Sequence, residues 1–255
     1  GAGAGTGARR FAGRRGAGAA VRFGVVVFPG TWSDRDCGGV VDALPGGELT
    51  YLWHRDRDLA GVDCVILPGG FSFGDHLRAG AIARVSPIMD TVQEFAARGG
   101  LVWGICNGFQ ILCEAGLLPG ALVRNDVLEF RCQWSHLVCE RTDTPYTSTL
   151  RRGQTIRVPI SHGEGSYLAD AATLSRLEHQ GQVVFRYSDA EGRVSRSANP
   201  NGSVDGIAGI VNEAGNVLGM MPHPERAADA ALGGTDGRLL FESVLRAQAA
   251  ELVHR

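Results

Sequence analysis

A single cysteine stands between two glycines in the segment 104–108, at the end of an apolar run. Flanking glycines let the backbone take a strained turn and let other groups approach closely. A helix predicted over 109–115 follows, so the Cys106 thiol would lie at a helix N-terminus, where unpaired N–H groups favour the thiolate. This spacing, G-x-C-x-G, is typical of a strand–nucleophile–helix turn. We expect covalent catalysis by Cys106; the alternative is a buried strand-end cysteine beside turn glycines.

A cysteine nucleophile needs a base, and the base needs an acceptor that orients it. Two of the seven histidines stand in H-x-E settings after predicted strands, His162 with Glu164 and His223 with Glu225. A proline on each side of His223 fixes the local backbone, which makes a rigid mount for a general base. The spacing therefore favours His223, with His162 as the alternative.

Two glycines at positions 69 and 70 follow the apolar segment 63–67. In open α/β sheets, ligands collect at the carboxyl ends of the strands, so this turn should lie beside Cys106. A glycine N–H there, together with the N–H of Asn107, would give a tetrahedral intermediate two donors, each worth roughly 2.7–4 kcal/mol. The alternative is ordinary turn glycine after a strand.

Strands and helices alternate from residue 21 onward, which predicts how these groups are positioned. Short apolar strands are expected over 22–28, 49–53, 63–67 and 101–105, with a helix opened by Ser86-Pro87 and a last helix over about 235–252. Such strands indicate a parallel sheet covered on both faces. More polar segments over 122–142, 154–161 and 182–187, and a hairpin of 205–211 with 216–221, predict an additional antiparallel region. The fold class is α/β.

Composition restricts the function classes. With 44% hydrophobic and 20% charged residues, the chain can build a globular core. No stretch approaches 18 apolar residues, the length that a membrane span needs, and a net charge of −2 without like-charged blocks gives no support for nucleic-acid binding. All 25 basic residues are arginine, which excludes lysine chemistry such as a Schiff base.

The six cysteines do not resemble a disulfide framework, so we expect a reducing compartment, the cytoplasm. Cys132, His136 and Cys139 could be considered as metal ligands. Three ligands without a partner pair are a weak signal, and strand packing explains them better, so no metal site is expected.

Residues 1–20 contain seven Gly, seven Ala, four Arg and no acid. Such a segment cannot bury enough apolar surface to offset its ordering entropy, so we expect a disordered leader. It could be a native tail, an organelle transit peptide or an extension upstream of the true start. We expect residues 21–255 to form one domain.

Taken together, these residues resemble the class I (triad) glutamine amidotransferases, whose fold is flavodoxin-like, and among them the glutaminase subunits of phosphoribosylformylglycinamidine synthase. The resemblance covers about 21–247 and is carried by the segments 23–30, 67–80, 104–110, 162–165, 199–209 and 216–226. One departure stands at Thr31-Trp32-Ser33, where the family commonly has Ser-Asn-Cys. Local contacts of that loop should therefore differ.

The resemblance implies roles for six residues: nucleophile Cys106, base His223, orienting acid Glu225, oxyanion-hole amides of Gly70 and Asn107, and Gln110 in contact with bound glutamine. The implied reaction is hydrolysis of glutamine to glutamate and ammonia through a Cys106 thioester. We expect weak activity from the chain alone.

The ammonia must be captured, and the resemblance implies a large synthetase subunit, often with a small third protein. The synthetase would use ATP and Mg to convert formylglycinamide ribonucleotide to formylglycinamidine ribonucleotide in purine biosynthesis. This chain needs no cofactor itself and has no lysine for a phosphate-binding P-loop. Two alternatives stay open: a cysteine amidase or peptidase of the DJ-1 type on the same scaffold, and an inactive regulatory subunit.

Overall fold

The computed structural model describes residues 20–254, and side chains as far as residue 250. The expected disorder of the leader falls on residues 1–19, outside the described part. Eleven strands are present in that part: β1 (Val21–Val27), β2 (Gly47–Trp53), β3 (Cys64–Leu67), β4 (Leu101–Ile105), β5 (Ala121–Val123), β6 (Arg131–Cys139), β7 (Thr155–His162), β8 (Ser166–Leu168), β9 (Val183–Ser188), β10 (Ile207–Val211) and β11 (Val217–Met220). The α-helices there are α1 (Asp34–Asp42), α2 (Pro87–Ala97), α3 (Asn107–Glu114), α4 (Ala171–His179) and α5 (Arg238–His254).

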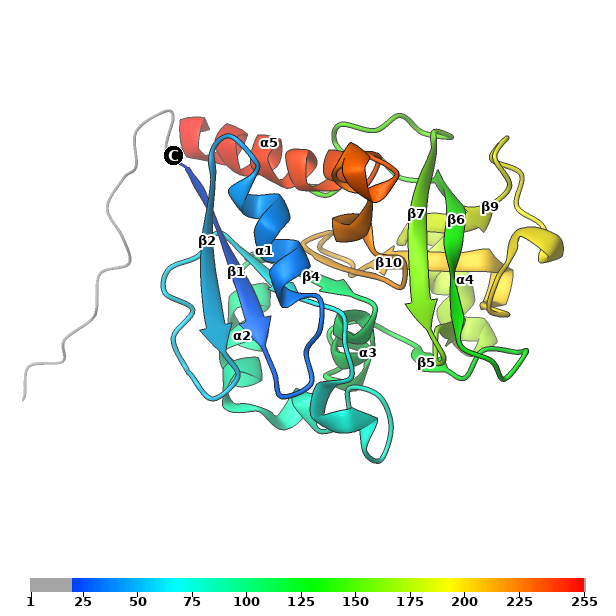
Figure 1. Cartoon of the computed structure of the whole chain (residues 1–255), viewed down its shortest axis with the longest axis horizontal. Coiled ribbons are helices and arrows are strands. Elements are labelled where there is room, and N and C mark those ends of the chain that lie inside the picture. The colour runs from blue at the N-terminus through cyan, green and yellow to red at the C-terminus, as the bar shows by residue number, and fades with distance from the viewer. Residues whose placement is uncertain (1–19, 255) are drawn as a thin grey trace, which may run out of the picture.

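Nine of these strands form one sheet in the order β2-β1-β3-β4-β11-β10-β9-β6-β7 (Figure 1). The strands from β2 to β11 run parallel, and those from β11 to β7 pair antiparallel. The predicted α/β fold, with a parallel sheet and an additional antiparallel region, is confirmed. The antiparallel strands continue the same sheet, because β11 pairs with β4 on one side and with β10 on the other.

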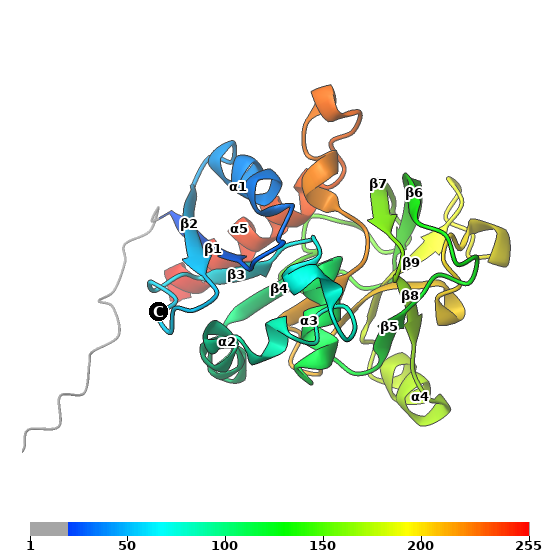
Figure 2. The ribbon, with the colours of Figure 1, turned by 60° about the horizontal axis from the view of Figure 1, so that its bottom comes forward.

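Helices cover both faces of the parallel half. Figure 2 shows α1 and α5 on one face and α2 and α3 on the other. This burial explains why β3 and β4 have no exposed position. Beside the antiparallel half, β5 and β8 form a two-stranded ribbon near α4.

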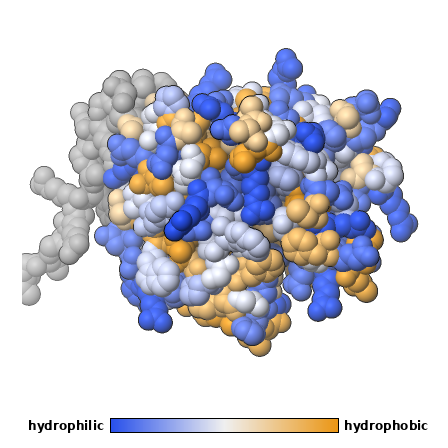
Figure 3. Space-filling view, in the orientation of Figure 1, coloured by the Kyte–Doolittle hydropathy of each residue, from blue (hydrophilic) through white to orange (hydrophobic). Residues whose placement is uncertain are grey.

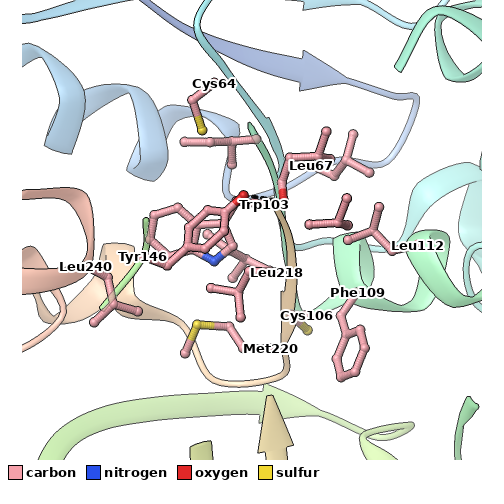
Figure 4. Packing of buried hydrophobic residues seen from close by; sticks show 14 of the residues in the cluster. Cys64, Leu67, Trp103, Cys106, Phe109, Leu112, Tyr146, Leu218, Met220 and Leu240 are labelled. Atoms are coloured by element: carbon pink, nitrogen blue, oxygen red, sulfur yellow. Dashed lines mark hydrogen bonds between the residues drawn. The ribbon is translucent and has the colours of Figure 1, made fainter. Parts of the chain in front are cut away.

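The core under the site is built around Trp103 on β4, which is fully buried. The ring centroids of Tyr146 and Phe241 lie 5.9 and 4.7 Å from the Trp103 ring. The Tyr146 hydroxyl is 2.9 Å from the Val102 carbonyl oxygen, so this buried polar group has a partner. Cys106 lies at the edge of this cluster, away from Tyr146 (Figure 4). The core thus fixes β4 directly before the cysteine.

Three details differ from the sequence predictions. Helix α3 begins at Asn107, two residues early, because the Cys106 carbonyl already accepts the N–H groups of its first turn. Helix α5 begins at Arg238, since residues 235–237 form tighter turns and the Asp236 carboxylate accepts the N–H of Arg157 at 2.7 Å. Ser86 precedes α2 as predicted but makes no side-chain capping bond.

Candidate active site

Cys106 occupies the single-residue bend between β4 and α3. Its backbone has φ 51° and ψ −107°, a conformation that L-residues rarely adopt. The α3 N–H groups of Phe109 and Gln110 point back to its carbonyl oxygen, at 2.9 and 3.2 Å. The bend therefore holds the cysteine at the N-terminus of α3 under local strain, as expected of a functional turn.

The glycines around Cys106 are required by close packing. A Cβ added to Gly108 would lie 1.9 Å from the Leu67 carbonyl oxygen, and one added to Gly104 would lie 2.6 Å from the Gly108 carbonyl oxygen. The spacing of this turn therefore brings α3 into contact with β3 and β4. A side chain at either position would push the helix away from the sheet.

The sheet register brings His223 to Cys106. Strand β11 pairs in parallel with β4, and the Cys106 N–H donates to the Met220 carbonyl at 2.8 Å. His223 follows Met220 by three residues and is itself fixed by donation of its N–H to the Pro159 carbonyl of β7 at 2.8 Å. Two segments more than 100 residues apart in the chain thus end at one place.

Glu225 orients the imidazole of His223. The Nδ1 atom of His223 donates to Oε1 of Glu225 at 2.6 Å, and the two residues are only 2% and 1% exposed. Among the described residues Nε2 has no partner that meets strict hydrogen-bond geometry, which leaves it free for Cys106. Burial opposes the charge on His223, but the Glu225 carboxylate and then Cys106 outweigh it and raise the pKa of His223 to about 10.

The turn at Gly69 and Gly70 lies against this group. A Cβ added to Gly69 would be 2.6 Å from Cε1 of His223. Gly70 (φ +151°) pairs with Thr31 in an isolated antiparallel β-bridge. In this bridge the Trp32 N–H donates to the Gly69 carbonyl, and the Phe71 N–H donates to the Gly30 carbonyl. The Gly70 N–H takes no part in these two bonds. Like the N–H of Asn107 at the start of α3, it can therefore serve a ligand.

The side chains of Asn107 and Gln110 connect three loops around the cysteine. Asn107 accepts the Ser72 N–H at 3.1 Å and donates to Oε1 of Gln110 at 2.8 Å. Gln110 in turn donates to the Glu164 carbonyl at 2.6 Å. Asn107 also lies 3.4 Å from Asp75, whose pKa burial and the Glu164 charge raise to about 6. These side-chain links could not be found from the sequence, since they depend on loop conformation.

His162, the alternative base, is engaged elsewhere. Its Nδ1 atom lies 3.1 Å from Oδ1 of Asn125, and Nε2 lies 3.5 Å from Nδ2 of Asn201. Burial and the charge of His223 lower the pKa of His162 to about 4. Its segment still borders the site, because the Ser161 carbonyl is 3.8 Å from the Cys106 sulfur. The geometry therefore selects His223 as the base candidate.

Exposed aromatic side chains border the nearly closed site. The ring centroid of Phe71 is 5.8 Å from that of Trp32 and 6.5 Å from that of Phe130, and all three side chains are exposed. The Phe130 ring also lies within van der Waals contact of a Cβ added to Gly163. Figure 3 shows hydrophobic side chains at the lower edge of its face, where Figure 1 places the loop after Phe71. Cys106 itself is only 5% exposed, so little of the residue is open to solvent between these side chains.

The residues considered for a metal are spread over β6. Cys132 is exposed and Cys139 buried, at strand positions that point to opposite faces of the sheet. Among the side chains of residues 20–250, no group of three or more His, Cys, Asp or Glu could hold a metal ion. No helix in the same range has the length and apolar character that a membrane crossing requires.

Comparisons with known proteins agree with this geometry. The family model for a CobB/CobQ-like glutamine amidotransferase domain matches residues 21–233. The chain is 59% identical to the phosphoribosylformylglycinamidine synthase subunit PurQ of Moorella thermoacetica over 225 residues, 88% of this chain and 95% of that relative. The PurQ of Salinibacter ruber is 58% identical, with the same coverage of 88% and 95%. The solved structure of PurLQS from Thermotoga maritima contains a chain that is 42% identical with a TM-score of 0.79, covering 90% of this chain and 99% of that one.

Proposed function

Since this chain belongs to the CobB/CobQ-like glutamine amidotransferases, and within them to the PurQ subunits of phosphoribosylformylglycinamidine synthase, we propose that it hydrolyses glutamine and supplies ammonia to a synthetase. The observation that carries the chemistry is the convergence of Cys106, His223 and Glu225. The register of β4 with β11 brings Cys106 and His223 together. Glu225 is held by the 2.6 Å hydrogen bond between its Oε1 atom and Nδ1 of His223.

In the proposed first half-reaction, His223 takes the Cys106 proton and the sulfur attacks the side-chain carbonyl carbon of glutamine. The S–C bond forms as the carbonyl π electrons move to oxygen. Collapse of this intermediate breaks the C–N bond, and His223 gives the proton to the leaving nitrogen. Ammonia and a γ-glutamyl thioester result. His223 then takes a proton from water as the water oxygen attacks the thioester carbonyl carbon. The C–S bond breaks to give glutamate, and His223 returns the proton to the Cys106 thiolate.

Glu225 is proposed to hold the tautomer in which Nε2 of His223 faces the sulfur and to stabilise the imidazolium that forms. The amides of Gly70 and Asn107 are proposed as the oxyanion hole. A Cβ added to Gly70 would lie 2.6 Å from the Trp32 nitrogen, and Asn107 opens α3 directly after the Cys106 bend. Close packing and the helix start thus orient the two donors before the charge develops.

Gln110 is proposed to contact the bound glutamine. In the structure its side-chain amide donates to the carbonyl of Glu164, three residues after Ser161, whose carbonyl lies 3.8 Å from the Cys106 sulfur. A substrate in the site would lie against this same bond. Gln110 thus links substrate binding to the position of the 162–165 segment.

We propose that a large synthetase subunit, together with a small third protein, receives the ammonia and that the synthetase alone uses ATP and Mg. This chain has no lysine and therefore no P-loop for nucleotide phosphates, and its described residues offer no acidic cluster for the metal. The solved structure of PurLQS supports such a complex. The compartment we propose is the cytoplasm, because the six cysteines are free thiols, as a reducing compartment keeps them.

The test uses the complex assembled with its synthetase. Replacing Cys106 with Ala should abolish product formation from glutamine while synthesis from added ammonium salt continues. A chloroketone analogue of glutamine should label wild-type Cys106 and not exposed Cys132. Glutamine-dependent activity in the Cys106→Ala complex would overturn the proposal. Retained hydrolysis in a His223→Ala variant would favour the DJ-1-type alternative, and an inactive wild type the regulatory one.

A further inference from the structure

Ser33 stands at a junction between two parts of the site. It precedes α1, at the N-cap position where a serine hydroxyl ordinarily accepts an N–H of the first helical turn. Here the Ser33 side chain makes no such capping bond. Its hydroxyl oxygen instead accepts Nη2 of Arg226 at 2.9 Å, and the residue is fully buried. A capping side chain has thus been redirected toward the turn that carries His223.

The backbone of Ser33 holds the proposed oxyanion turn. Its N–H donates to the Gly69 carbonyl at 3.0 Å, beside the same donation from Trp32. A Cβ at Gly69 would lie 3.3 Å from the Ser33 hydroxyl oxygen and 2.6 Å from Cε1 of His223. Ser33, Gly69 and His223 therefore meet at one point.

Arg226 completes the connection from the other side. It directly follows Glu225, and its Nε atom lies 3.9 Å from Oε1 of Glu225, the oxygen that His223 uses. The same Nε donates to Asp36 of α1 at 3.3 Å. The guanidinium is 29% exposed, and its planar set of donors can engage both partners at once.

We propose that Ser33 and Arg226 form a positioning pair, which fixes the Gly69–Gly70 turn relative to the His223–Glu225 turn. The inference rests on the proposed glutaminase function and extends it. Neither side chain touches the reacting atoms. The pair acts by keeping the oxyanion donors and the base in one geometry while the loops around the site open for glutamine and close again.

A double-mutant cycle in the synthetase complex tests this pair, with Ser33→Ala, Arg226→Gln and the combination. Because a displacement of about 1 Å in a catalytic group costs roughly 10²-fold, we expect kcat for glutamine hydrolysis to fall by about tenfold in Ser33→Ala and up to about 100-fold in Arg226→Gln. KM for glutamine should change by less than about threefold. The double variant should be no slower than Arg226→Gln.

Two further variants calibrate the cycle. Arg226→Lys can keep the ion pair with Asp36 but not both bonds, so its kcat should lie between those of wild type and Arg226→Gln. Arg57→Gln removes a surface arginine paired with Asp90 and should leave all rates unchanged. Ammonium-dependent synthesis reports folding and docking, and it should stay at the wild-type rate in every variant.

The outcomes separate the two proposals. Additive losses in the double variant, unchanged kcat in Ser33→Ala and Arg226→Gln, or parallel loss of ammonium-dependent synthesis would overturn the positioning pair. If instead Cys106→Ala still used glutamine, the proposed function itself would fail, whatever the cycle gave.

Discussion

The Cys106 N–H donates to the Met220 carbonyl oxygen at 2.8 Å, across the parallel pairing of β4 with β11. This bond fixes where the cysteine bend lies relative to the turn that begins after Met220. A slip of this register would carry His223 away from the sulfur. The distance between the proposed nucleophile and the proposed base is therefore set by the central sheet, whose strands β3 and β4 are buried throughout.

Glu225→Gln tests the orienting carboxylate. The amide is nearly isosteric but cannot stabilise the imidazolium, and it can favour the wrong tautomer of His223. We expect kcat for glutamine to fall by about 10⁴-fold, the cost of the equivalent change in serine hydrolase triads. Initial rates in the synthetase complex measure the effect, with ammonium-dependent synthesis as the folding control. A loss of less than tenfold would show that Glu225 does not act in this way.

The parallel and antiparallel strands were predictable because each carries a regular pattern of apolar residues. The hairpin of β10 and β11 is an example, since its two apolar runs meet around a short polar turn. Cys106 was predictable for a related reason: the glycines that its bend needs stand beside it in the chain. Helix ends were less accurate, as at α5, where the bond between Asp236 and Arg157 depends on a distant strand.

The choice between the two histidines could not be made from spacing alone. In the sequence, His162 and His223 both come after segments predicted as strands, and both precede a glutamate by two residues. The two histidines differ in their tertiary contacts. Asn125 and Asn201 contact the His162 ring, whereas the pairing of β11 with β4 places His223 near the cysteine. The sequence marks Ser33 only as part of a departure from the family pattern, because its link to Arg226 spans 193 residues.

His162→Gln should change the pH dependence of stability. The pKa of this imidazole is lowered from 6.5 to about 4 in the folded chain, so below pH 6.5 the unfolded chain binds a proton that the folded chain does not. The stabilisation of the folded chain by the neutral His162 is fully present above pH 6.5 and is lost as the pH falls toward 4. By linkage this amounts to about 2 kcal/mol between pH 7 and pH 5.

Urea unfolding at pH 7 and pH 5 measures this contribution. The variant should lose less stability than the wild type over that interval, by about that amount. If the variant and the wild type lost the same stability between pH 7 and pH 5, His162 would not be held neutral by its burial. Activity gives a second contrast, because His162→Gln should keep hydrolysis whereas His223→Gln should abolish it.

Glycine-to-alanine changes in two helices should have opposite signs. A Cβ at Gly108 of α3 would lie 1.9 Å from the Leu67 carbonyl oxygen, so Gly108→Ala should destabilise the fold by about 1–3 kcal/mol and displace the cysteine bend. Gly39 of α1 is exposed, and a Cβ there meets nothing within 4 Å. Gly39→Ala should stabilise by about 0.5–1 kcal/mol, the gain in helix propensity. Thermal unfolding compares the two, and equal effects would contradict the packing argument.

Glutamate release by the chain alone should be slow and should rise when the synthetase is added. The residues of the proposed triad are buried, with Cys106 only 5% exposed. The loop beyond the Gly69–Gly70 turn contains three non-glycine residues at positive φ, Phe73, Asp75 and Leu77, a conformation that costs of order 1–3 kcal/mol each. A partner that contacts this loop can shift it toward a substrate-accessible arrangement, and 1.4 kcal/mol of differential binding corresponds to about tenfold in population.

We therefore expect at least about a tenfold increase in glutamate release at saturating synthetase, since even modest differential binding to the loop reaches that factor. Phosphoribosyl substrate and ATP should be varied separately, so that docking and turnover of the partner are distinguished. A Cys106→Ala chain mixed with synthetase supplies the background rate. Full activity of the isolated wild-type chain would show that the loop opens without a partner, because the strained residues would then impose no barrier to glutamine entry.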